Sequence, residues 1–208
     1  MTLKYRQASY TCFIGFRRDT MRSGKHLAST LNMRLFFGLK PEPKIALEIA
    51  TWRDKALPPM RHSVHVDNLH ITLAFLGEIH ESQLETLMSS AAQVAASPFE
   101  ISMNQMGYWR KPDLLWIAAE RIPDAIIALA KELGSLSVSM GSRREKRAYF
   151  PHITIVRNCR VPPPINIIKP VFTLCFSHYS LFESINTRSG VRYRQLQDWQ
   201  LGTGSTWL

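Results

Sequence analysis

Cysteine is scarce in this sequence, with Cys12, Cys159 and Cys175 among 208 residues. Their odd number and irregular spacing match no metal-binding motif. Unpaired thiols are typical of proteins in a reducing compartment, where disulfides rarely persist. We therefore expect free cysteines and a cytoplasmic location.

Long apolar runs are also missing. Hydrophobic residues make up 45% of the chain, yet no segment reaches the roughly 18 consecutive apolar residues that a membrane-spanning helix needs. This distribution is typical of a soluble globular protein. A chain of 208 residues is long enough for one domain with a sizeable core, or for one domain of two similar lobes. We expect a monomer with no membrane partner.

Acidic residues are few relative to basic ones, because 16 Asp and Glu stand against 26 Lys and Arg, a net charge of +10 at pH 7. A basic protein favours a polyanionic partner, most commonly nucleic acid. The alternative is a solvated basic surface. Half of the excess, +5, falls in residues 1–32, which hold six bases and one acid. The rest of the chain is therefore only mildly basic.

Residues 1–32 differ from the rest of the chain in composition. They are rich in Arg, Ser and Thr and hold one short apolar patch, YTCFIGF. An amphipathic targeting peptide is one interpretation, and a disordered tail is another. We favour a leader ahead of a native start at Met33, because MRLFFGL begins a strand pattern at once. The folded domain is then expected over residues 33–208.

Strand and helix patterns alternate after residue 33. Strand patterns cover residues 34–39, 69–76, 99–108, 114–119, 153–156, 171–182 and 193–201, and helical spacing covers residues 44–56, 81–96 and 124–140. Strands mixed with helices, with strand–helix–strand patterns in each half, predict an α+β protein with mainly antiparallel sheets.

Two strand segments carry the same unusual motif. Residues 68–77 read NLHITLAFLG and residues 151–157 read PHITIVR. Side chains alternate between the faces of a strand, so His70 and Thr72 share one face while their apolar neighbours lie behind them, and His152 and Thr154 repeat the pattern. One HxT tripeptide is weak evidence, since most strand histidines are structural. Two copies in matching frames indicate two related lobes that face each other across a cleft.

Two opposed histidines are suited to acid–base chemistry. With a pKa near 6.5, one imidazole is a base and the other an acid near neutral pH. Such a pair fits in-line displacement at phosphorus, in which the hydroxyls of Thr72 and Thr154 donate to phosphoryl oxygens. Arg157 adds a positive charge and a bidentate donor. Strict alternation puts Arg157 on the face opposite His152, so it joins the site only if the strand twists, bulges or ends there. The alternative is a surface arginine.

Metal chemistry is the natural rival for paired histidines. No third ligand is evident near either motif, and the nearest metal-like spacing, His62-x-x-His65, falls in a loop-like stretch beside two prolines. The phosphate-binding pattern GxxxxGK[ST] is also absent, which argues against a nucleoside triphosphatase. We therefore expect neither a metal nor another cofactor.

The two motifs resemble the signatures of the 2H phosphoesterase superfamily. More narrowly, the chain resembles the LigT-like RNA 2′,3′-cyclic phosphodiesterases, formerly described as 2′-5′ RNA ligases. The resemblance covers about residues 33–201 and leaves residues 1–32 unmatched. The supporting segments are RLFFGL, LLWIAAE, YSLFES and the closing YRQLQDWQL.

The resemblance implies a fold and a reaction. The fold would be bilobal, with two pseudo-symmetric antiparallel sheets flanked by helices and a central cleft. The reaction would open a 2′,3′-cyclic phosphate at a single-stranded RNA 3′ end with water, leaving a 2′-phosphomonoester without metal or cofactor. His70 would be the proton donor and His152 the proton acceptor, although two pseudo-symmetric histidines could exchange roles. Thr72, Thr154 and Arg157 would hold the phosphate.

Two further questions stay open at this stage. Phe36 or Phe37 would stack on the terminal base, since aromatic faces suit single-stranded RNA ends; the alternative is that both rings pack in the core. The same site could instead ligate RNA through a 2′-5′ bond, hydrolyse a small nucleotide such as an ADP-ribose cyclic phosphate, or only bind RNA. Both motifs are complete, which favours catalysis over a binding-only role.

Overall fold

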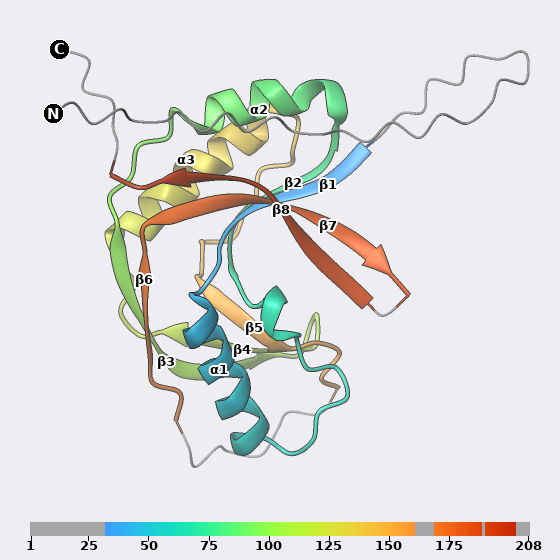
Figure 1. Cartoon of the computed structure of the whole chain (residues 1–208), viewed down its shortest axis with the longest axis vertical. Coiled ribbons are helices and arrows are strands. Elements are labelled where there is room, and N and C mark those ends of the chain that lie inside the picture. The colour runs from blue at the N-terminus through green and yellow to red at the C-terminus, as the bar shows by residue number, and fades with distance from the viewer. Residues whose placement is uncertain (1–31, 161–168, 189, 203–208) are drawn as a thin grey trace, which may run out of the picture.

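The computed structural model describes residues 32–160, 169–188 and 190–202 (Figure 1). The predicted leader lies outside the described residues except for Asn32, at which the first strand begins. Within these ranges the chain forms, in order, β1 (Asn32–Leu39), α1 (Pro43–Ala56), the 3-10 helix η1 (Val66–Asn68), β2 (Ile71–His80), the 3-10 helix η2 (Glu81–Gln83), α2 (Leu84–Ala91), β3 (Phe99–Trp109), β4 (Leu114–Ala119), α3 (Asp124–Ser139), β5 (His152–Val156), β6 (Phe172–Phe176), β7 (His178–Thr187) and β8 (Gly190–Gln200).

The strands form one curled antiparallel sheet with the order β6-β3-β4-β5-β2-β1-β7-β8. Its halves, β6-β3-β4-β5 and β2-β1-β7-β8, meet where Ile71 of β2 pairs with Ile153 of β5. The predicted α+β class with antiparallel strands is confirmed. The predicted pair of separate sheets is corrected to two halves of one sheet, because the two HxT segments lie side by side and pair directly.

The two halves repeat the same connection. A helix links neighbouring antiparallel strands in each half, α1 between β1 and β2, and α3 between β4 and β5. Each helix also contacts the other half: α3 lies against β2, and α1 reaches β6, where the rings of Trp52 and Phe172 are 5.7 Å apart. In Figure 1, α2 and α3 lie together at one end of the molecule and α1 at the other. This repeat agrees with the prediction of two related lobes.

The hydrophobic core lies between the sheet and the helices. Pro43 suits the first turn of α1, because its φ is already helical and its missing N–H has no partner to lose there. Ile49 of α1 and Leu133 of α3 are fully buried, as are Ile71 and Ile153 of the central strands. One face of β2 and β5 is therefore apolar, and the other is free for polar side chains. None of the described helices is long and apolar enough to cross a membrane.

Two segments differ from the elements that the sequence predicts. The expected strand 171–182 is two strands, β6 and β7, separated by Ser177. The break is needed because β6 pairs with β3 at one end of the sheet whereas β7 pairs with β1 in the other half. The expected helix 81–96 is shorter, since η2 leads into α2 and α2 ends at Ala91.

Candidate active site

The pairing of Ile71 with Ile153 brings the two HxT motifs together. Both isoleucines are fully buried, so their neighbours along each strand point to the opposite face. Because the strands are antiparallel, the neighbours of the pair also lie across from one another, His70 from Thr154 and Thr72 from His152. One face of the sheet centre therefore presents two imidazoles and two hydroxyls in a pseudo-two-fold arrangement.

His70 is half-buried directly before β2 and has a partner at each ring nitrogen. Its Nδ1 lies 2.7 Å from the carbonyl oxygen of Asn68, and its Nε2 lies 3.1 Å from Oγ1 of Thr72. A carbonyl oxygen only accepts, so Nδ1 carries the proton. In the neutral ring, Nε2 is then the basic nitrogen and accepts the hydroxyl hydrogen of Thr72.

His152 repeats this arrangement at the start of β5. Its Nδ1 donates to the carbonyl oxygen of Phe150 at 2.9 Å, again two residues earlier in the chain. Both neutral histidines are therefore held in the same tautomer, in which Nε2 carries no hydrogen and is the nitrogen that can exchange a proton with a substrate. Thr154 lies two residues further along β5, half-buried and opposite Trp116 of β4.

The surroundings favour the neutral form of both histidines. The pKa of His70 is lowered to about 4, first by burial and then by the positive charges of Arg157 and His152, while the hydrogen bond to Asn68 acts in the opposite direction. Burial also lowers the pKa of His152, followed in the same direction by the charge of Arg157, while the hydrogen bond to Phe150 raises it. A bound anion would raise both pKa values, because an opposite charge stabilises the protonated ring.

Arg157 lies at the site although strict alternation would place it on the opposite face. β5 ends at Val156, and Asn158 has a positive φ of 50°, so the chain turns directly after the strand. The Arg157 guanidinium donates to the hydroxyl of Tyr193 at 3.1 Å, and its charge acts on both histidines. From the sequence, Arg157 could join the site only if the strand twists, bulges or ends there. The structure meets the last of these conditions, because β5 ends at Val156.

Aromatic rings surround both histidines. The His70 ring lies 5.0 Å from Phe36 and 4.8 Å, edge to face, from Tyr193. The His152 ring lies 4.6 Å from Trp109 of β3 and 6.1 Å from Phe150. These rings exclude water from one side of each imidazole, which accounts for the burial that lowers both pKa values.

The predicted base-stacking residues are buried, and that prediction is corrected. Phe36 is 3% exposed beneath His70 and against Phe182, and Phe37 is fully buried beside Tyr179. Neither ring has a free face for a base. Of the two alternatives that the sequence left open, packing of both rings is the one that the structure supports.

Phe75 is the exposed ring that the sequence reasoning missed. It is 69% exposed and pairs across the strands with Phe36, so its side chain lies on the same face as Phe36 and His70. If side chains alternated regularly between the two faces of the strand after His70, Phe75 would point away from the site and into the core. The register with β1 shifts between Ala74 and Thr72, and Leu73 and Ala74 are both buried, so Phe75 returns to the site face. Only the pairing with β1 reveals this bulge.

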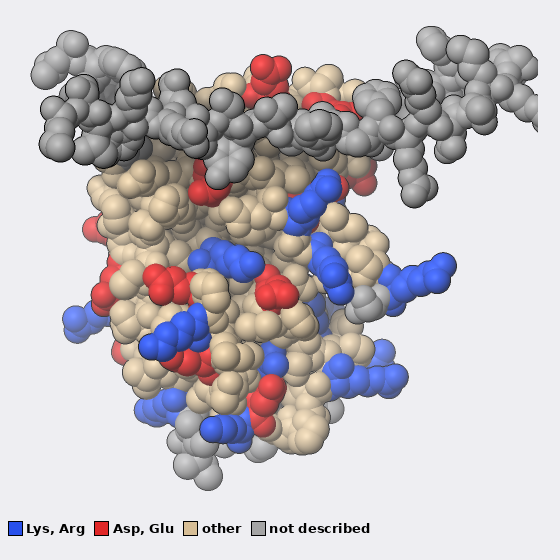
Figure 2. All heavy atoms as spheres, viewed as in Figure 1, with Lys and Arg blue, Asp and Glu red and all other residues tan. Residues whose placement is uncertain are grey.

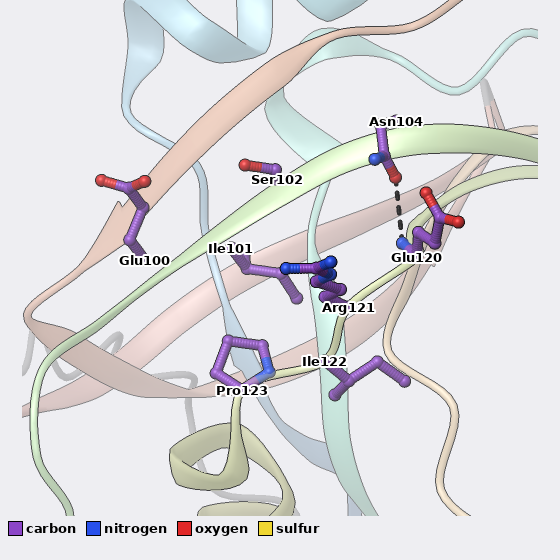
Figure 3. Close-up of a pocket in the computed structure, with 8 residues that line it drawn as sticks. All are labelled: Glu100, Ile101, Ser102, Asn104, Glu120, Arg121, Ile122 and Pro123. Carbon is purple, nitrogen blue, oxygen red and sulfur yellow. Dashed lines mark hydrogen bonds between the residues drawn. The ribbon is translucent and has the colours of Figure 1, made fainter.

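A separate hollow of about 550 Å³ lies away from the HxT motifs, between β3 and the connection from β4 to α3 (Figure 3). Ser102, Asn104 and Arg121 are among its lining residues, and Asn104 Oδ1 accepts the backbone N–H of Glu120 at 2.9 Å. None of its lining residues belongs to the HxT motifs. In the part of the chain that the structure describes, no group of three or more His, Cys, Asp or Glu side chains is arranged to hold a metal ion.

Comparison with known proteins identifies relatives along most of the chain. The family model of the 2′-5′ RNA ligase superfamily matches residues 41–186. The RNA 2′,3′-cyclic phosphodiesterase of Escherichia coli is 30% identical over 81% of this chain and 96% of its own length, and that of Methanocaldococcus jannaschii is 27% identical over 80% and 100%. The crystal structure of E. coli LigT complexed with 3′-AMP has a TM-score of 0.76 at 30% identity, covering 83% of this chain and 99% of LigT. The chain therefore belongs to the 2′-5′ RNA ligase superfamily.

Proposed function

We propose that this protein is an RNA 2′,3′-cyclic phosphodiesterase that opens the cyclic phosphate at an RNA 3′ end and leaves a 2′-phosphomonoester. The observation that carries the proposal is the pairing of Ile71 with Ile153, which presents two histidines of the same tautomer on one face. The names of the E. coli and M. jannaschii relatives support hydrolysis of this substrate. Residues 33–208 carry a net charge of +5, which fits a polyanionic substrate.

The proposed reaction uses Nε2 of each histidine. His152 takes a proton from a water molecule, whose oxygen attacks phosphorus. The bond from phosphorus to the 3′ oxygen breaks, and His70 gives its Nε2 proton to that oxygen, so the products are a 3′ hydroxyl and a 2′-phosphate. Solvent then returns a proton to His70 and removes one from His152. Each proton transfer of this kind contributes roughly 10²- to 10⁴-fold in rate.

Thr72, Thr154 and Arg157 are the proposed phosphate ligands. The two hydroxyls flank the histidines on the same face, where they reach the non-bridging oxygens that carry charge in the transition state. When phosphate binds, the Thr72 hydroxyl turns from Nε2 of His70 to a phosphoryl oxygen. The negative charge of the phosphate then raises the pKa of His70 from about 4, which is how this histidine becomes a proton donor.

Phe75 replaces Phe36 and Phe37 as the proposed base-stacking residue. It is the large hydrophobic residue most exposed on the strands that carry the site, and it shares their active face. Stacking on an aromatic ring tolerates any base, which suits an enzyme acting on RNA ends of different sequence. The basic edge at and below the tip of the β7–β8 hairpin, visible in Figure 2, offers positive charge for the phosphates of the same strand.

A small nucleotide is the second candidate substrate. Crystal structures of E. coli LigT complexed with 3′-AMP and with ATP, at TM-scores of 0.76 and 0.73, favour it because they show that protein with single nucleotides. A nucleoside 2′,3′-cyclic phosphate contains the reacting group and one base, so the same chemistry applies. Turnover that rises with RNA length would favour the RNA end over the single nucleotide.

The test is hydrolysis of a short RNA that ends in a 2′,3′-cyclic phosphate, with EDTA present. Wild type should form a 2′-phosphate end, and His70→Ala and His152→Ala should each lose roughly 10²- to 10⁴-fold in kcat. His178→Ala is the matched control, because His178 is exposed and its Nδ1 bonds to Ser177. Loss of activity with EDTA, or full activity in either active-site variant, would contradict the two-histidine mechanism. A 2′-5′ linked product would indicate ligation instead.

A further inference from the structure

The end of the β7–β8 hairpin extends past its neighbour in the sheet. β1 pairs with β7 over residues 35–38 and 180–183, whereas β7 and β8 stay paired out to Thr187 and Gly190. Residues 184–187 and 190–193 therefore have no partner strand among the described residues besides each other. Figure 1 shows this end of the hairpin projecting away from β1. A two-stranded end of this kind is mobile unless another element holds it.

Asn68 holds this end of the hairpin through its side-chain amide. Nδ2 donates to the carbonyl oxygen of Val191 at 2.7 Å, and Oδ1 accepts the backbone N–H of Tyr193 at 3.3 Å. One carbonyl and one N–H on alternate residues of β8 are thereby satisfied, as they would be by a neighbouring strand. Asn68 ends η1, so the contact joins this helix to the edge strand of the sheet.

The same residue is in direct contact with the histidine of the first motif. The backbone carbonyl of Asn68 accepts the Nδ1 hydrogen of His70 at 2.7 Å. Tyr193, held by the Asn68 amide, covers the His70 ring at 4.8 Å and accepts a hydrogen bond from Arg157 at 3.1 Å. Asn68 thus links the hairpin to His70, a proposed proton-transfer group. Through Tyr193 it also links the hairpin to Arg157, a proposed phosphate ligand.

We infer that Asn68 is a positioning residue, whose side chain fastens the hairpin so that Tyr193 covers His70 and orients Arg157. This role rests on the proposed function, because it concerns the groups that would carry out hydrolysis. Without the amide, the backbone of the hairpin end loses both hydrogen bonds to Asn68, and the Tyr193 hydroxyl that accepts from Arg157 is held less firmly in place. A displacement of about 1 Å in such groups is enough to cost roughly 100-fold in rate.

The first test is NMR on the full-length chain and does not depend on activity. In Asn68→Ala, amide hydrogen exchange at Val191 and Tyr193 should become faster. The pKa of His70 should rise toward 6.5, since its lowering to about 4 comes first from burial; the charges of Arg157 and His152, which also act on His70, are still present in the variant. The matched control is Asn104→Ala, because Asn104 also accepts a backbone N–H, at 2.9 Å, but lies away from the histidines.

The second test separates positioning from general stability. In Asn68→Ala, kcat for the RNA cyclic phosphate should fall about 10- to 100-fold with a smaller change in KM, and Asn104→Ala should leave both unchanged. Because Asn68 acts through Tyr193, adding Asn68→Ala to Tyr193→Ala should cost little more than Tyr193→Ala alone. An unchanged His70 pKa and unchanged hairpin exchange in Asn68→Ala would overturn the inference. Wild type without hydrolysis would instead count against the proposed function, and the NMR experiment would still decide the role of Asn68.

Discussion

Ile71 and Ile153 pair across the centre of the sheet, and neither side chain is exposed to solvent. This contact joins the two halves of the sheet and places His70, Thr72, His152 and Thr154 on the opposite face. The apolar side of each HxT motif is therefore as important to the site as its polar side. Packing around this pair sets the separation of the two histidines.

Shortening Ile153 should destabilise the protein in proportion to the volume removed. We expect Ile153→Ala to lower the free energy of unfolding by about 2–5 kcal/mol and Ile153→Val by about 0.5–1.5 kcal/mol, because the site is fully buried and a cavity remains. Urea unfolding measures both values. Ile127→Ala is the control, since Ile127 on α3 is 38% exposed and its loss should cost less. A cost for Ile153→Ala below that of Ile127→Ala would contradict the assignment of this pair to the core.

The pH profile of kcat/KM should have its descending limb below the ordinary pKa of histidine. In the proposed mechanism one imidazole is protonated and the other neutral, and kcat/KM reports the pKa values of the free enzyme. Burial and the charge of Arg157 lower both pKa values, to about 4 for His70. Above the higher of the two, both rings are neutral, and kcat/KM should fall about tenfold per pH unit. Rates measured from pH 4.5 to 9 would show this limb beginning below about pH 6.5.

Removing the charge of Arg157 should shift the descending limb of the pH profile of kcat/KM. Arg157 lowers the pKa of both histidines, so Arg157→Gln should shift the descending limb to higher pH. The same variant should also reduce kcat, since Arg157 is a proposed phosphate ligand. Arg194→Gln is the control, because Arg194 is already paired with Glu183 at 2.6 Å. A limb that stays at the same pH in Arg157→Gln would mean that the charge does not reach the titrating groups.

The roles of donor and acceptor can be separated with a substrate that needs no acid. In a 3′-deoxynucleoside 2′-(4-nitrophenyl phosphate), no neighbouring hydroxyl can attack phosphorus, and nitrophenolate leaves without a proton. His70→Gln should therefore lose much less activity on this ester than the roughly 10²- to 10⁴-fold expected on the cyclic phosphate. His152→Gln should lose activity on both substrates, because the attacking water still needs a base. If His152→Gln instead retains activity on the ester and His70→Gln loses it on both substrates, then His152 is the proton donor and His70 the proton acceptor.

Much of the site could be predicted from strand periodicity, and the exceptions have identifiable causes. Alternation placed His70 with Thr72 and His152 with Thr154, because both motifs keep regular geometry around the central pair. It failed for Phe75, where a register shift against β1 leaves two successive residues buried. It was also insufficient for Arg157, whose position depends on where β5 ends.

Long-range pairing accounts for the other differences. The apolar pattern of residues 171–182 is continuous, yet the chain breaks at Ser177 because β6 and β7 belong to opposite halves of the sheet. Phe36 and Phe37 both occur in a strand next to the site, but β7 and β8 bury them with Phe182, Tyr193 and Trp199. Neither effect is encoded in the local sequence, since each depends on contacts with strands that are far away in the chain, β3 and β1 for the break at Ser177 and β7 and β8 for the two rings.

Phe75 should contribute to substrate binding and little to stability. We expect Phe75→Ala to raise KM for a short RNA cyclic phosphate roughly 5- to 150-fold, which corresponds to the 1–3 kcal/mol of one base stacked on an aromatic ring. Phe75→Trp should keep KM near the wild-type value, because it retains a flat ring. Since the side chain is 69% exposed, the free energy of unfolding should change by no more than about 0.5 kcal/mol.

The matched comparison for Phe75 is Phe36→Leu, in the cross-strand partner that is 3% exposed. Its main effect should be on stability, with a loss of about 1 kcal/mol or more, because it alters packing beneath His70. If Phe75→Ala leaves KM unchanged for RNA and for a cyclic mononucleotide alike, no base stacks on this ring. If KM rises equally for both substrates, Phe75 contacts the terminal base; a rise for RNA alone would place the stacked base one nucleotide upstream.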